Sequence, residues 1–161
     1  MRILVVGMGL IGGSICKSIK AATSHAVYGC DVQQAVLNDA IADGAIDGTG
    51  TMTDSTYDMI ILCLHQRIAI QMVQEALPKI PTGTILVDTC GLKGRMVRDL
   101  TYRCRKAGVR YVGTHPMAGR EKNGYYASIP NLFQNANLIV TPVDGTDEAA
   151  LDTVKELADQ M

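Results

Sequence analysis

Three glycine residues near the start of the chain, spaced as G-x-G-x-x-G, limit its possible folds more than any other feature. Gly7, Gly9 and Gly12 follow an apolar, β-branched run at residues 2–6 and precede isoleucines that recur every fourth residue. This order predicts a buried strand, a tight turn and a helix with one apolar face. In such a turn the first glycine permits the sharp bend, the second lets the backbone approach a phosphate, and the third lets the helix pack closely on the strand.

Short apolar runs alternate with amphipathic stretches along the rest of the chain. Further strands are predicted at residues 26–30, 59–64, 84–87, 110–113 and 137–141. Helices are predicted at residues 35–42, 67–77 and 93–107, with a last helix capped by Thr146 and running to Met161. Residues 44–56, rich in Gly, Asp and Thr, are expected to hold a loop and an edge strand. The alternation predicts an α/β fold of the Rossmann type, with a doubly wound, mostly parallel sheet and helices on both faces.

Composition and charge exclude several classes of protein. The 161 residues suit one domain, residues 1–161, and the net charge of −1 creates no field that favours nucleic acid or a membrane surface. Basic residues on the predicted helix 93–107 are better explained as a solvated helix face than as a nucleic-acid interface. Five cysteines without a C-x-x-C pair and three widely separated histidines predict free thiols, no metal site and a cytoplasmic protein.

An acidic residue follows the second predicted strand at the distance that a dinucleotide site requires. The Asp31 carboxylate can accept hydrogen bonds from the adenosine ribose and would repel the extra phosphate of NADP. Val32, Gln33 and Gln34 come next and offer no arginine to that phosphate. We therefore predict NAD as the cofactor, although a glycine-rich turn beside an exposed aspartate is the alternative. The predicted cofactor-binding residues in this part of the chain are Gly7, Gly9, Leu10, Ile11, Gly12 and Asp31.

A histidine follows the predicted strand 110–113, at the edge where ligands of a doubly wound sheet bind. His115 is expected to lie over the cofactor, where a neutral imidazole can take the proton of a substrate hydroxyl as hydride leaves. On the residues alone, a histidine fixed by turn packing beside Pro116 explains the pattern equally well. Lys93 begins a predicted helix near the same crevice and could attract a dicarboxylate substrate. His65 is more simply explained as a loop residue.

Three segments, taken together, carry a resemblance to a known family. They are residues 7–14 (GMGLIGGS), 88–94 (DTCGLKG) and 113–124 (GTHPMAGREKNG). In this order they resemble the prephenate and arogenate dehydrogenases, and the HPMAG stretch is the most specific part.

The resemblance implies an NAD-dependent oxidative decarboxylation of prephenate to 4-hydroxyphenylpyruvate, a step of tyrosine biosynthesis. His115 would bond the ring hydroxyl of this small-molecule substrate as the catalytic residue. Cys63 and Leu64 would pass beneath the cofactor. Gly91 and Lys93 would lie on the substrate side, and Gly91 stands where many relatives carry a serine.

The length of the chain departs from that family. Its enzymes usually carry a C-terminal helical domain that dimerises and closes the substrate pocket, and nothing in residues 1–161 corresponds to it. The apolar face of the last predicted helix runs to Met161 without a stop signal. We therefore expect a homodimer formed through a domain missing from this chain. An arogenate dehydrogenase, a dehydrogenase for another small acid, and a truncated NAD-binding module without activity remain the alternatives.

Overall fold

The structure is a computed structural model that describes residues 1–54 and 56–161. Within these residues seven strands form one sheet in the order β3-β2-β1-β4-β5-β6-β7. The strands are β1 (Arg2–Val6), β2 (Ala26–Cys30), β3 (Gly48–Thr49), β4 (Met59–Leu62), β5 (Ile85–Asp88), β6 (Arg110–Pro116) and β7 (Leu138–Thr141). Neighbouring strands are parallel except for the antiparallel pair β6 and β7. The predicted Rossmann-type fold is confirmed.

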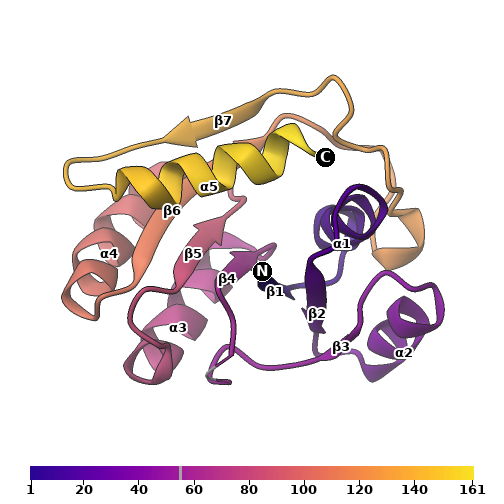
Figure 1. The fold of residues 1–161 in the computed structure, drawn as a ribbon, viewed down its shortest axis with the longest axis horizontal. Coiled ribbons are helices and arrows are strands. Elements are labelled where there is room, and N and C mark those ends of the chain that lie inside the picture. Colours follow the sequence, from indigo (N-terminus) through magenta and orange to yellow (C-terminus); the bar gives the residue numbers. More distant parts are fainter. Residues whose placement is uncertain (55) are drawn as a thin grey trace.

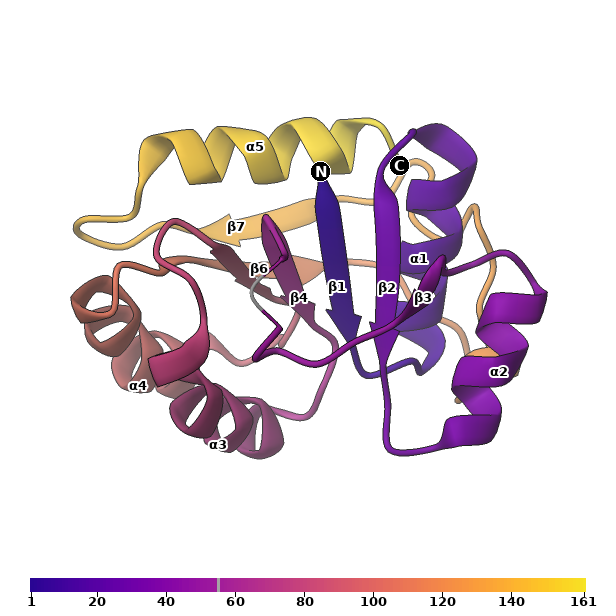
Figure 2. The ribbon, with the colours of Figure 1, turned by 60° about the horizontal axis from the view of Figure 1, so that its bottom comes forward.

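Helices cover both faces of this sheet (Figure 1, Figure 2). The first face packs against α1 (Leu10–Ala22), α2 (Gln34–Ala42) and α5 (Glu148–Asp159). The second face packs against α3 (Gln66–Ala76) and α4 (Lys93–Lys106). Two short 3₁₀ helices complete the chain: η1 (Leu77–Lys79) follows α3, and η2 (Tyr125–Ala127) lies between β6 and β7. The sheet therefore divides the interior into two separate apolar cores.

The central strand β1 supplies both cores. Its residues Ile3 and Val5 point into the first core, and Leu4 and Val6 point into the second, all of them 2% exposed or less. Successive strand residues face opposite sides, so a strand covered on both faces is apolar throughout. Each of these side chains contributes roughly 1.5–3 kcal/mol of burial free energy. This packing fixes the position of the glycine turn that follows.

Two predicted strand ends are wrong by two or three residues, and one of them changes the position of the histidine. Strand β6 runs to Pro116 instead of ending at residue 113, because β7 pairs with its last residues and Asn137 O accepts a hydrogen bond from Met117 N at 2.8 Å. His115 therefore lies inside a strand, opposite Ile139, and not in a loop after it. Strand β4 ends at Leu62, two residues before the predicted end at residue 64.

The predicted N-cap of the last helix is also wrong. Asp147 caps α5, since its carboxylate accepts a hydrogen bond from Ala150 N at 2.8 Å. The Thr146 hydroxyl instead accepts from Val143 N at 2.9 Å and closes the turn before the helix. The edge strand expected within residues 44–56 is β3, which pairs with β2, and loop segments flank it. Ser55, within that range, lies outside the described residues.

Candidate functional site

The loops that follow four parallel strands meet at one edge of the sheet. Val6 in β1 is level with Leu62 in β4. Leu62 is level with Asp88 in β5, and Asp88 is level with Gly113 in β6. Because neighbouring strands lie 4.7–4.9 Å apart, β1 and the strand that carries His115 are separated by roughly 14 Å. The glycine turn and the imidazole therefore border the same edge with two strand ends between them.

The glycine turn is closed by direct contact between backbone segments. Gly7 has a φ of +94°, and a Cβ there would lie 2.5 Å from Cys63 O. A Cβ on Gly12 would lie 1.9 Å from Gly7 O, so the start of α1 touches the turn itself. A Cβ on Gly9, by contrast, would meet no atom within 4 Å. The turn is closed against the protein at Gly7 and Gly12 and open to a ligand at Gly9.

The N-terminus of α1 presents free backbone donors to this open side. Helix α1 begins at Leu10, and among the described residues no side chain caps it and no acidic residue stands in its first turn. The first amides of a helix lack partners within the helix, and the helix dipole favours an anion there. The capped N-terminus of α5 shows the other case, because the Asp147 carboxylate already accepts from one of its backbone donors, Ala150 N. The arrangement at α1 fits a phosphate group.

The carboxylate of Asp31 is fixed beside the turn. It follows β2, and its Oδ2 accepts a hydrogen bond from Met8 N at 2.7 Å, inside the turn itself. Its Oδ1 accepts from Gln33 N at 2.9 Å. Each carboxylate oxygen has a further lone pair, so both can still accept a hydrogen bond from a ligand hydroxyl.

The two residues that follow β4, Cys63 and Leu64, pack against the turn and form its floor. Cys63 N donates to Val6 O at 2.8 Å, and the side chain of Leu64 would lie 2.8 Å from a Cβ on Gly7. Burial raises the pKa of the Cys63 thiol to about 12, so this thiol stays protonated at neutral pH. Cys63 and Leu64 are therefore packing residues of the floor and carry no nucleophile.

His115 lies between the end of β6 and the loop that follows β5. Its Nδ1 is 3.4 Å from Thr89 O, a long hydrogen bond. Because a carbonyl oxygen only accepts, this contact favours a proton on Nδ1 and leaves the lone pair of Nε2 available. A Cβ on Gly91 would lie 3.3 Å from Cε1 and 3.5 Å from Nε2 of the imidazole. The half-buried ring can therefore accept a proton at Nε2 beside a residue with no side chain.

Lys93 is close to this loop, but its ammonium group is paired within the protein. It forms an ion pair with Asp88, whose side chain is fully buried, and the Lys93 side chain itself is 13% exposed. The same carboxylate accepts a hydrogen bond from Tyr111 Oη at 2.6 Å. Neither Asp88 nor Tyr111 was among the site residues predicted from the sequence. The available signal was a carboxylate closing the apolar run of β5, where an unpaired charge would be costly.

The predicted site residues fall into two groups along this edge. The cofactor group surrounds the turn and consists of Gly7, Gly9, Leu10, Ile11, Gly12, Asp31, Cys63 and Leu64. The substrate group lies at the ends of β5 and β6 and consists of Gly91, Lys93 and His115. His65 is exposed at the start of α3 and has no part in either group.

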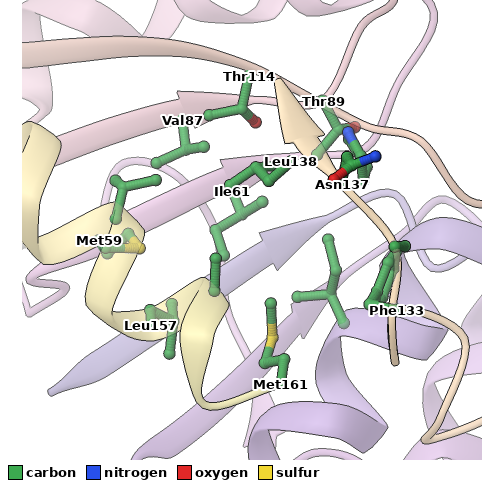
Figure 3. A pocket seen from close by; sticks show the side chains of 15 residues that line it. Met59, Ile61, Val87, Thr89, Thr114, Phe133, Asn137, Leu138, Leu157 and Met161 are labelled. Atoms are coloured by element: carbon green, nitrogen blue, oxygen red, sulfur yellow. The ribbon is translucent and has the colours of Figure 1, made fainter. Parts of the chain in front are cut away.

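An apolar cavity of about 80 Å³ lies on the first face of the sheet, between strands β4 to β7 and helix α5 (Figure 3). Figure 3 shows Thr89 and Asn137 near one end of it and Leu157 and Met161 near the other. Thr114 points into this cavity, whereas His115, the next residue of the strand, lies against Gly91 on the opposite face. No charged or acid–base side chain lines the cavity among the described residues. It can hold apolar groups but cannot perform proton transfer.

Two further kinds of site were sought in the part of the chain that the structure describes. No three His, Cys, Asp or Glu side chains there come close enough to hold a metal ion. None of its helices has the length and apolar character that a membrane crossing needs.

Comparisons with known proteins agree with this geometry. The family described as prephenate dehydrogenase, nucleotide-binding domain, matches residues 15–161. The prephenate dehydrogenase of Bacillus subtilis is 31% identical over 160 residues, which are 96% of this chain and 43% of that protein. The chain thus spans less than half the length of this relative.

Solved structures give the same result. The prephenate dehydrogenase of Aquifex aeolicus, solved in complex with hydroxyphenyl propionate and NAD+, has a TM-score of 0.89 and 29% identity. The match covers 99% of this chain and 57% of that one. The Synechocystis arogenate dehydrogenase has a TM-score of 0.88 and 25% identity, covering 99% of this chain and 56% of the other. A family match across nine tenths of its residues shows that this chain belongs to the nucleotide-binding domains of the prephenate dehydrogenases.

Proposed function

We propose that this chain binds NAD along the edge described above. The pyrophosphate would rest on the free amides of Leu10, Ile11 and Gly12, at the point where Gly9 leaves the surface open. The adenosine ribose would donate its hydroxyls to Asp31, and the nicotinamide half would extend over Cys63 and Leu64 toward His115. The observation that supports this placement most strongly is the uncapped start of α1 beside a carboxylate fixed to the same turn.

The same carboxylate supports a preference for NAD over NADP. A phosphate on the ribose would meet the negative charge of Asp31, and the next residues, Val32, Gln33 and Gln34, carry no positive charge. Titration calorimetry of the chain with each dinucleotide tests this assignment. We expect NAD to bind at least tenfold more tightly, and equal affinities would contradict the assignment.

We propose the oxidative decarboxylation of prephenate as the reaction. NAD supplies the hydride acceptor. The free Nε2 of His115 accepts the proton of the ring hydroxyl while the carbon that bears this hydroxyl loses hydride. The bond to the ring carboxylate then breaks, carbon dioxide leaves, and its electron pair moves through the ring to the new carbonyl oxygen. That oxygen takes the proton back from His115, which gives the aromatic hydroxyl of 4-hydroxyphenylpyruvate. Arogenate, which has an amino group in place of the side-chain keto group, is the alternative substrate.

Gly91 and Lys93 are proposed to border the substrate. The missing side chain at Gly91 leaves space beside Nε2 of His115 for the substrate hydroxyl. By the family resemblance, Gly91 stands where many relatives carry a serine, so residue 91 offers no hydroxyl to the substrate. The Lys93 charge is already balanced by Asp88, so its attraction for a substrate carboxylate is much weaker than that of a free lysine.

We propose that full turnover needs residues outside this chain. More than half of the Bacillus subtilis relative lies outside the matched region, which supports a second domain that closes the substrate pocket and forms a homodimer. The alternative is a module that binds NAD without activity of its own. The five free thiols support a reducing, cytoplasmic location.

One assay tests the reaction. The chain is mixed with NAD and either prephenate or arogenate, and NADH formation is followed. We expect NAD binding with weak or absent turnover by the chain alone. We expect turnover of prephenate when the chain is joined to the remaining sequence of the Bacillus subtilis relative. Full-strength turnover by residues 1–161 alone would contradict the second-domain proposal, and a joined protein inactive on both substrates would contradict the proposed reaction.

A further inference from the structure

A fully buried carboxylate lies beneath the loop that contacts His115. Asp88 is the last residue of β5, and its side chain is 0% exposed. Its Oδ1 accepts hydrogen bonds from Cys90 N at 2.9 Å and from the Lys93 ammonium, and its Oδ2 accepts from Tyr111 Oη at 2.6 Å. Three donors from three different places in the chain therefore converge on one carboxylate.

The surroundings keep the Tyr111 hydroxyl protonated. Burial and the nearby Asp88 charge raise the pKa of the Tyr111 hydroxyl far above its usual range, so it remains a hydrogen-bond donor. Gly113, next to the cluster, leaves room for it, because a Cβ there would lie 3.3 Å from Tyr111 Oη and 3.5 Å from Asp88 Oδ2. A buried ion pair of this kind is weak evidence for stability, since desolvation offsets most of its attraction. If the Asp88 cluster positions His115, the structure must connect the two.

That connection is the loop at residues 89–92. Near the start of the loop, the Asp88 carboxylate accepts a hydrogen bond from Cys90 N. Just after the loop, Lys93, the first residue of α4, forms an ion pair with the same carboxylate. Between these two attachments lie Thr89, whose carbonyl contacts His115 Nδ1, and Gly91, which packs against the imidazole. The Thr89 hydroxyl adds a third attachment by donating to Leu62 O at 3.0 Å. Thr89 N also donates to Leu62 O at 3.1 Å, so Leu62 holds the amide side of Thr89, and the Asp88 carboxylate holds the chain beyond the Thr89 carbonyl through Cys90 and Lys93.

We propose that Asp88, Lys93 and Tyr111 form a positioning cluster that holds the proton of neutral His115 on Nδ1. This inference rests on the proposed function only in the use made of the free Nε2 as the proton acceptor. Among the described residues, none of the three forms a hydrogen bond with the imidazole, and we propose that each acts through the loop at residues 89–92. Loss of one donor lets that loop relax, weakens the Thr89 contact and allows the other tautomer, with the proton on Nε2, which an unrestrained imidazole in water favours.

The test is a measurement of the His115 tautomer by nitrogen-15 NMR, at a pH where the imidazole is neutral. The chain of 161 residues is used without cofactor, and His115→Gln identifies the His115 signals among those of three histidines. We expect the wild-type ring to carry its proton on Nδ1. Tyr111→Phe, which removes one hydroxyl and keeps the ring, should lower the ratio of the Nδ1–H to the Nε2–H form by roughly threefold.

Two further variants make the result decisive. Lys93→Gln removes the charge paired with Asp88 and should lower the same ratio by about tenfold. Tyr102→Phe is the matched control, because Tyr102 is 70% exposed on α4, and it should leave the ratio unchanged.

Several outcomes would overturn the proposal. The first is a wild-type His115 that carries its proton on Nε2. The second is an unchanged tautomer ratio in folded Tyr111→Phe and Lys93→Gln. The third is unfolding of both variants, which would show that the cluster stabilises the fold and does not position His115. Failure of the proposed function is a separate result, because it would show as absent NAD binding with the tautomer as expected.

Discussion

The glycine turn and the His115 region hold their backbones by opposite means. At the turn, atoms approach so closely that no side chain fits, and a Cβ on Gly12 would overlap Gly7 O. Around His115 the backbone is held by side chains, with the Thr89 hydroxyl on Leu62 O and the Asp88 carboxylate on Cys90 N. The turn should therefore be damaged by an added atom, and the His115 region by a lost hydrogen bond.

The largest effect is expected on the His115 side, in turnover. His115→Gln removes the proton acceptor and should lower kcat with prephenate by about 10²–10⁴-fold, or about 3–5 kcal/mol. NAD affinity should change by less than about twofold, because the proposed contacts to the pyrophosphate and the adenosine ribose lie on the turn, away from His115. The measurement is steady-state kinetics of residues 1–161 joined to the rest of the Bacillus subtilis relative. Turnover that survives the substitution would remove His115 from its proposed role.

The next effect tests the turn through stability. Gly12→Ala places a Cβ 1.9 Å from a backbone oxygen, and we expect it to destabilise the fold by about 3 kcal/mol. For a chain of this size that equals a fall in Tm of roughly 6–12 °C in thermal unfolding. NAD binding should weaken in parallel as the turn opens.

Two glycine substitutions serve as controls for Gly12→Ala. Gly9→Ala adds a Cβ that meets no atom within 4 Å, so Tm should stay within about 2 °C while NAD binding weakens. Gly91→Ala adds a Cβ 3.3 Å from the His115 ring, which can give way slightly, and should cost less than about 1 kcal/mol. If Gly91→Ala proved as damaging as Gly12→Ala, the contrast between the two regions would be wrong.

A smaller effect is expected at Asp31, where the turn does use a side chain. Asp31→Asn keeps the shape but removes the negative charge and replaces one of the two oxygens that accept from Met8 N and Gln33 N by a donor. We expect NAD affinity to fall by about tenfold and the preference over NADP to narrow, measured by calorimetry. Asp152→Asn, an exposed charge on α5, should change neither quantity. An unchanged ratio of NAD to NADP affinity in Asp31→Asn would contradict the assignment of Asp31 to the ribose.

The smallest effect concerns a surface carboxylate, Asp47, which directly precedes β3. The hydrogen bond from Lys20, and after it the one from Val27 N, lowers the pKa of Asp47 below its usual value of 3.8. Because the folded pKa is the lower one, the stabilisation is present above about pH 4 and is lost as pH falls through the folded pKa. Asp47→Asn should therefore cost about 0.5 kcal/mol at pH 7 and nothing near pH 2, measured by denaturant unfolding. An equal cost at both pH values would rule out this ionic origin.

The same contrast explains which parts could be predicted from the sequence. The glycine turn, Asp31 and the alternation of strands and helices depend on residues close together in the chain, so spacing and periodicity revealed them. The extension of β6 to Pro116 depends on pairing with β7, and its hydrophobic pattern contains no sign of that partner. The N-cap of α5 was missed by one residue because two neighbouring side chains, Thr146 and Asp147, can both cap a helix.

The candidate site divides in the same way. Six of the eight predicted cofactor residues come from two places with recognisable local patterns, residues 7–12 and residue 31, and the resemblance supplied the other two, Cys63 and Leu64. The setting of His115 instead joins residues 62, 89, 91 and 115 across three strand ends. Asp88 and Tyr111 are 23 residues apart, and no spacing rule connects them. Hydrogen bonds between distant side chains form only after the sheet has set the strand register, so single-sequence patterns carry little information about them.

The central claim is that a dinucleotide on the glycine turn brings its nicotinamide ring to His115. Its most direct test compares NAD with ADP-ribose, which lacks that ring, by NMR titration of the isotope-labelled chain. We expect both ligands to shift the amide signals of Gly9 and Leu10, and NAD alone to shift the imidazole signals of His115. If NAD and ADP-ribose leave the His115 imidazole equally unchanged while both bind, the proposed cofactor placement is contradicted.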